Sequence, residues 1–219
     1  MDDITLSLLV ILAVGLLVVL IFVLTRRNRA AQEKALEQMA LERGWRLEVV
    51  REPLVYGQRI RYKDWMIELL TKSSGRSATS TASSSNVTST TTWRAPGRGN
   101  TLLIGPRSTQ INLGGLGEAL LRQVLQMALG SEADGLVEVK AGSDAFRKDF
   151  MIYARDEEDV RRLISPFLES TLMNWKKMSP TVKRTSQGLS IELPRNRLQK
   201  QEDIEILVKL GDLLLAQEF

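Results

Sequence analysis

The side chains that could carry covalent or acid–base chemistry are limited in this chain, which contains no cysteine and no histidine. Thiol nucleophiles, disulfides, zinc sites built from Cys or His, and imidazole general bases are therefore excluded. Three chemistries remain: a serine or threonine activated by a lysine, a pair of carboxylates, and Mg²⁺ or Ca²⁺ held by carboxylates. Each needs a particular local arrangement of residues.

The serine–lysine candidate is the stretch KMSPT, residues 177–181. It resembles the Ser-Met-x-Pro-Thr box of signal peptidases, and this resemblance implies a membrane-tethered Ser/Lys hydrolase. The order differs here, because Lys177 stands before Met178 and the serine, Ser179, follows it. We interpret Ser179-Pro180 as a segment that ends a helix, and the hydrolase stays an alternative function.

The densest group of carboxylates is Asp156 with the three acidic residues 157–159. All four lie at the start of a predicted helix, where Asp156 can cap the first turn and the others suit the helix dipole. The glycines at 114–117 also precede a predicted helix, but they match no phosphate-binding motif. We predict no catalytic, cofactor-binding or metal-binding residues and no cofactor.

Basic residues are in excess, with 30 Lys and Arg against 26 Asp and Glu, a formal net charge of +4 and a sequence pI of about 9.5. This balance modestly favours acidic partners such as anionic lipid or nucleic acid. Basic residues interspersed with carboxylates are, however, typical of a solvated surface. Nucleic-acid binding is therefore kept as an alternative function, with these candidate residues: Lys176, Lys177, Lys183, Arg184, Arg195, Arg197 and Lys200.

A long uncharged segment, from Ile4 to Thr25, opens the chain. As a helix it would be about 33 Å long at 1.5 Å per residue, which matches a bilayer core of about 30 Å. A cleaved signal peptide would need a basic leader and a shorter apolar run, whereas the leader here is Met-Asp-Asp. The sequence therefore predicts an uncleaved transmembrane anchor over residues 1–25.

Arginines follow this segment directly, whereas no Lys or Arg precedes it. By the positive-inside rule, we predict a single-pass protein of the inner membrane with its N-terminus outside and residues 26–219 in the cytoplasm. Arg26, Arg27 and Arg29 are candidate contacts for lipid headgroups. Good helix formers then continue to a stop at Gly44, which predicts a juxtamembrane helical stalk over residues 26–44.

The remaining residues, 45–219, predict an α+β domain in which helices pack on an antiparallel sheet. Alternating apolar residues predict strands on both sides of a turn at Lys63-Asp64 and a hairpin that turns at Gln187-Gly188. A Ser/Thr-rich tract predicts a loop at about 73–90, because it lacks the apolar surface that would offset the entropy of ordering.

Helical patterns follow in the second half of the chain. A helix that ends at Gly130 is predicted to carry Leu116, Leu120, Val124 and Met127 on one face. Ser165-Pro166 is predicted to cap and restart a helix, and a last helix is predicted over about 200–217. The predicted inward residues of this last helix are Ile204, Leu207, Val208 and Leu215.

Within residues 135–215 the chain resembles a bacterial family of membrane-anchored proteins of unknown function. Its pattern places an aromatic-x3-Phe strand before an acidic-capped helix that ends in Leu-hydrophobic-x-Pro. The matching positions are Phe146, Phe150, Asp156, Leu163, Ile164 and Pro166. The resemblance implies an α+β cytoplasmic domain tied to a membrane, and it carries over no catalytic residues.

The function that the sequence favours is a non-catalytic module that interacts with a protein partner or with the membrane surface. The expected partners are the lipid bilayer and an unidentified protein, and neither nucleic acid nor a small-molecule substrate is expected. The membrane-tethered hydrolase and the nucleic-acid-binding module are the alternatives.

Overall fold

The computed structural model describes residues 3–73, 87–97, 99–107, 115–175 and 179–217, without the side chains of 3–13, 29 and 115–121. Most of the predicted Ser/Thr-rich loop, residues 74–86, lies outside the described residues. So do Lys176, Lys177 and the glycine at 114.

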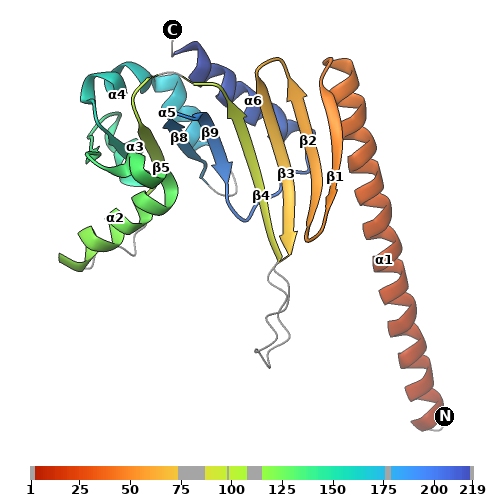
Figure 1. Cartoon of the computed structure of the whole chain (residues 1–219). Helices are drawn as coiled ribbons and strands as arrows, with labels where there is room; N and C mark the ends of the chain where they lie inside the picture. The colour runs from red at the N-terminus through yellow and green to blue at the C-terminus, as the bar shows by residue number, and fades with distance from the viewer. Residues whose placement is uncertain (1–2, 74–86, 98, 108–114, 176–178, 218–219) are drawn as a thin grey trace.

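The described fold is α+β and is built on one antiparallel sheet with the strand order β1-β2-β3-β4-β9-β8-β5-β7-β6 (Figure 1). Hairpins join neighbouring strands from β1 to β4, and the β8–β9 hairpin continues the sheet beside β4. The strands are β1 (Arg46–Glu52), β2 (Val55–Tyr62), β3 (Trp65–Ser73), β4 (Val87–Ala95), β5 (Leu102–Pro106), β6 (Val137–Glu138), β7 (Phe150–Ala154), β8 (Thr181–Thr185) and β9 (Gly188–Leu193).

Both predicted hairpins are present, and the turn at Lys63-Asp64 is confirmed, because Tyr62 pairs with Trp65 and Lys63 adopts a left-handed φ of 46°. The second turn lies one residue earlier than the predicted Gln187-Gly188. Thr185 pairs with Gly188, so Ser186 and Gln187 form the turn, and Gly188 takes a φ of 125°. A Cβ at Gly188 would collide with the carbonyl oxygen of Ala95 on β4, so glycine is required where the β8–β9 hairpin meets its neighbour.

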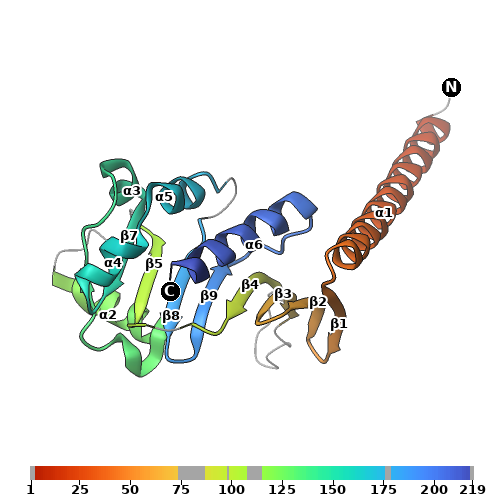
Figure 2. The same cartoon turned by 90° about the horizontal axis from the view of Figure 1, so that it is seen from above.

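Helices cover one face of the sheet and part of the other (Figure 2). Residues of α3, α4, α5 and α6 share one core cluster with the buried side chains of the strands. On the opposite face α2 and η1 pack over β5 and β7 through Leu125, Leu129 and Ala133. The bounds are α2 (Gly115–Leu129), η1 (Gly130–Ala133), α3 (Asp144–Asp149), α4 (Glu157–Leu163), α5 (Pro166–Met173) and α6 (Gln201–Ala216).

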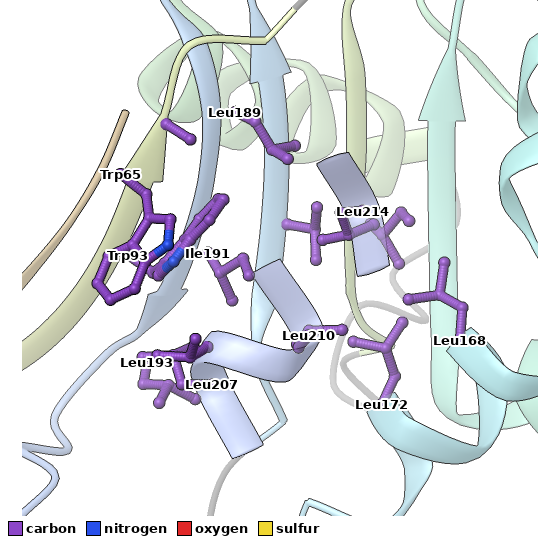
Figure 3. Close-up of a cluster of buried hydrophobic side chains, with 14 of the residues drawn as sticks. Trp65, Trp93, Leu168, Leu172, Leu189, Ile191, Leu193, Leu207, Leu210 and Leu214 are labelled. Atoms are coloured by element: carbon purple, nitrogen blue, oxygen red, sulfur yellow. The ribbon is translucent and has the colours of Figure 1, made fainter. Parts of the chain in front are cut away.

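The centre of the core lies between α6, α5 and the middle of the sheet (Figure 3). Trp93 of β4 is fully buried there, and Leu207, Leu210 and Leu214 of α6 lie beside it along the sheet. Apolar residues of α6 recur at intervals of three and four, which places them on one side of the helix. Burial of this side fixes α6 across the strands.

The acidic residues 156–159 lie at the start of α4, as the sequence predicts, with Asp156 as the N-cap and the other three in the first turn. The Asp156 carboxylate accepts a hydrogen bond from the backbone N–H of Glu158 at 2.9 Å, at the start of α4. The Ser165 hydroxyl likewise accepts from the N–H of Leu168, and Pro166 is the first residue of α5. Both caps satisfy N–H groups that have no partner inside the helix.

The first helix, α1 (Asp3–Glu42), is continuous over 40 residues and projects from the edge of the sheet (Figures 1 and 2). Its C-terminal turns pack on the domain through Leu36, Met39 and Ala40, which are buried. Arg43 then binds Glu205 of α6 at 2.6 Å. The predicted stop is confirmed, because the helix ends at Glu42 and Gly44 takes a φ of 66°.

The prediction of a transmembrane helix is contradicted. Within the described part of the chain, no helix is both long and apolar enough to cross a bilayer. This finding overturns the predicted anchor over residues 1–25 and the predicted single-pass location in the inner membrane.

A carboxylate on η1 ties three distant segments together. Glu132 accepts hydrogen bonds from the hydroxyl of Thr101 before β5 at 2.8 Å, and from the hydroxyl of Ser186 in the β8–β9 turn at 2.6 Å. The backbone N–H of Ser186 also donates to it. The hydrogen bonds from Ser186 and Thr101 lower the pKa of Glu132 below its usual value of 4.5.

We therefore expect Glu132→Gln to destabilise the fold in a way that depends on pH. Because the folded state lowers the pKa of this carboxyl, its stabilisation is present above about pH 4.5 and is lost as the pH falls through the folded-state pKa. Urea unfolding at a series of pH values measures this. The wild type should be more stable than the variant at pH 7, and the gap should close in acid.

The matched control is Glu158→Gln, which changes a carboxylate that, among the described residues, forms its ion pair with Arg162 on the surface of α4. Surface pairs of this kind contribute little to stability. A gap between wild type and Glu132→Gln that stayed constant from pH 7 to pH 3 would contradict the assigned role of the Glu132 charge.

Candidate binding surfaces

The structure separates most of the residues that the sequence singled out. Ser179 is half-buried just before β8, while Lys177 lies outside the described residues. Lys183 faces the solvent side of β8 and pairs with Glu192 at 2.8 Å, whereas its neighbour Arg184 points to the other side and is buried. The basic residues at 183–200 therefore do not form one patch.

Arg26 and Arg27 are exposed on α1, and the side chain of Arg29 is not described. Their contact with lipid headgroups stays a prediction. The acidic residues 157–159 are engaged in ion pairs with Arg161, Arg162 and Arg184. Among the described residues, no group of three or more Asp or Glu is placed to hold a metal ion.

In the part of the chain that the structure describes, no helix covers one face of the sheet over β1 to β4, β9 and β8 (Figure 2). Burial alternates along these strands, so that residues of one set are buried and those of the other are half-exposed. Successive side chains of a strand point to opposite faces, and the strand pairing puts the half-exposed set on this face. Four arginines belong to it, and we call them the arginine face: Arg46, Arg59, Arg61 and Arg94.

Glu48 sits among three of these arginines at the edge of the sheet. It lies 3.3 Å from Arg46, 3.6 Å from Arg61 and 4.0 Å from Arg59. Arg59 is directly opposite Glu48 in the pairing of β1 with β2. One carboxylate therefore serves three guanidinium groups.

Glu68 of β3 lies between the other members of the array. It binds Arg59 at 2.8 Å and lies 3.8 Å from Arg94 of β4. Two carboxylates thus balance four arginines, which leaves this surface with two uncompensated positive charges. Arg46, Arg61 and Arg94 keep 79%, 51% and 56% of their side chains exposed, so their donors remain accessible to a partner.

A second concave surface lies at the base of α1. This polar groove has a volume of about 400 Å³ and is lined by Gln32 and Glu33 of α1, by Arg51 and Gln58 of the first hairpin, and by Arg197 before α6. Its lining mixes charges of both signs with apolar residues, among them Leu36, Val49 and Leu198, and this mixture does not indicate the chemistry of a ligand.

Sequence reasoning missed the arginine face, although a signal for it exists. Arg59 and Arg61 are separated by one residue in a predicted strand region, and so are Arg46 and Glu48. Residues two apart in a strand share a face. The pairing of four strands was needed to show that these residues, together with Arg94, come together.

Comparison of the chain with protein-family models, with curated proteins and with solved structures found no significant match. The resemblance of residues 135–215 to a membrane-anchored bacterial family therefore stays a prediction.

Proposed function

We propose that this chain is a non-catalytic interaction module that binds an acidic segment of a protein partner on the arginine face. The excess of positive charge over an uncovered sheet surface is the observation that supports it. Arginine is suited to this role because its planar guanidinium matches a carboxylate in a bidentate geometry. Charge complementarity of this kind favours encounter with an acidic partner and rejection of a basic one.

A nucleic acid is a weaker match to the same surface. Sheets that bind single strands use aromatic side chains on which the bases stack. Along the described part of this face the arginines alternate with Thr, Ser, Met66 and Leu70, and no aromatic residue is among them. Glu48 and Glu68 would also lie next to the phosphates, which would oppose binding.

The test compares the full-length wild type with a triple variant, Arg46→Gln, Arg61→Gln and Arg94→Gln. We expect the affinity for a fluorescent peptide of eight glutamates, measured by anisotropy, to fall about tenfold in the variant. The affinity should also decrease with added salt, because the charges are exposed and screened. The three sites are among the more exposed of the array, so the fold should survive the change.

The matched control removes three arginines from another surface, through Arg155→Gln, Arg161→Gln and Arg162→Gln around α4. It has the same net charge as the test variant and should keep the wild-type affinity. Equal losses in both variants would mean that only the net charge matters, and the proposal would be withdrawn. Tighter binding of an oligothymidylate of eight nucleotides than of the peptide would favour a nucleic acid instead.

A further inference from the structure

A pocket of about 580 Å³ opens where α1, the β2–β3 hairpin and α6 meet. It is separate from the arginine face. Its walls include Trp45 at the start of β1, Tyr62 and Trp65 beside the hairpin turn, and Asp212 of α6, and Arg43 and Lys63 also line it. Three elements distant in sequence therefore build one concave site.

The aromatic walls of the pocket form a connected cluster. The rings of Trp45 and Trp65 meet edge to face, with centroids 5.3 Å apart, and Tyr62 lies 5.7 Å from Trp65. The faces of two of these rings already attract cations of the chain itself. Arg43 lies over Trp45 at 5.3 Å, and Lys63 lies over Tyr62 at 5.1 Å. Aromatic faces in this arrangement are suited to a positively charged group.

The carboxylate of Asp212 is exposed and lines the pocket. Among the described residues, no ion pair or hydrogen bond holds it. Partial desolvation raises its pKa above the usual value, and the charge of Lys63 opposes that shift. The carboxylate is therefore accessible to a cationic ligand that enters the pocket.

The charge balance of the pocket fits a single positive charge. Arg43 is neutralised by its ion pair with Glu205 at 2.6 Å. This leaves Lys63 against Asp64 and Asp212, a net charge of −1. Lys63 stands on a turn at the rim, with its backbone in the left-handed region, and it is the group that an incoming cation would displace from the site.

We propose that this pocket binds a primary alkylammonium group, with the ammonium at Asp212 and the alkyl chain against the rings of Trp45 and Trp65. The carboxylate supplies the charge, and the aromatic edges supply apolar contact for the methylene groups. The ammonium of Lys63 competes for the same place. The ligand is either a free amine or a lysine side chain of another protein, and both present the same group.

The test follows the indole N–H signals of the full-length chain by NMR while n-butylammonium is added. We expect saturable shifts of the Trp45 and Trp65 signals and a smaller shift of the Trp93 signal, because Trp93 is fully buried and does not line the pocket. The neutral analogue 1-pentanol should produce no saturable shift. Absence of a saturable shift up to about 50 mM n-butylammonium, a concentration that detects weak binding, would overturn the proposal, and so would equal shifts with 1-pentanol.

Two substitutions should change the affinity in opposite directions. Asp212→Asn should weaken binding about tenfold, because the charge partner is lost, and Asp203→Asn on the same helix is the control without effect. Lys63→Asn should tighten binding about threefold, since asparagine tolerates the left-handed turn and removes the competing cation. A purely structural role of Asp212 would not predict this gain, and wild-type affinity of Asp212→Asn would overturn the proposal.

One further titration, with N-acetyl-lysine methylamide in place of n-butylammonium, distinguishes a lysine side chain of another protein from a free amine as the natural ligand. Tighter binding of the lysine derivative would assign the site to a side chain of another protein. Equal or weaker binding would assign it to a free amine. Both results support an alkylammonium site and differ only in where the ligand comes from.

Discussion

Replacing Gly211 with alanine is expected to lower the free energy of unfolding by about 2 kcal/mol. The helix axis of α6 passes so close to Trp93 that an added Cβ would lie inside contact distance of two indole carbons and 2.8 Å from Nε1. Overpacking of a full core lowers the free energy of unfolding by about 3 kcal/mol here, and the better helix propensity of alanine raises it by about 1 kcal/mol. Urea unfolding followed by circular dichroism measures the difference.

The same substitution at Gly15 is the control, because an added Cβ there meets nothing within 4 Å and the residue also lies in a helix. Gly15→Ala should leave stability unchanged or raise it. A double-mutant cycle tests the cause: Trp93→Phe removes the indole atoms that collide. We expect the double variant to lose at least about 1 kcal/mol less than the sum of the two single losses. Additive losses would contradict the assigned contact.

This contact also shows the limit of what the sequence could predict. The apolar period of the last helix is legible in the sequence, and the helix is confirmed. Of its predicted inward residues, Ile204, Leu207 and Val208 are buried and Leu215 is partly buried. That Gly211 must be a glycine follows only from the position of Trp93, which lies more than a hundred residues earlier. Local periodicity identifies the face of an element, and the opposing element decides which residue fits.

The helix before Gly130 illustrates an error of the same origin. Its predicted apolar face includes Val124 and Met127, but these residues are exposed, whereas Leu125 and Leu129 pack on β5 and β7. The helix contains apolar residues on more than one side. Which side is buried depends on how it crosses the sheet, and no local signal specifies that.

Hairpins and caps were predicted well because their causes are local. The turn at Lys63-Asp64 and the caps at Asp156 and Ser165 involve residues within a few positions of each other. The arginine face and the aromatic pocket were not predicted, because each needs three or more strands or helices in place. The interaction of Arg184 with α4 belongs to the same class and leads to the second large expected effect.

Asp159→Asn is expected to lower the free energy of unfolding by about 2 to 3 kcal/mol. Asp159 in the first turn of α4 binds the guanidinium of Arg184 on β8, whose side chain is only 4% exposed. Arg184 also donates from Nε to the carbonyl of Asn100 at 2.7 Å, which links the start of β5 to the same group. Removing one partner of a buried pair costs about 3 to 5 kcal/mol, and the 29% exposure of Asp159 reduces this figure.

Glu157→Gln in the same helical turn is the matched control, since it breaks an exposed i,i+4 pair with Arg161 at 2.7 Å. That pair should contribute only about 0.3 to 0.5 kcal/mol, and added salt should reduce it further. The loss in Asp159→Asn should change little between 0.05 and 1 M NaCl, because a buried charge is poorly screened. Equal losses in the two variants, or a loss at Asp159 that salt removes, would show that the pair behaves as a surface contact and does not hold α4 against the sheet.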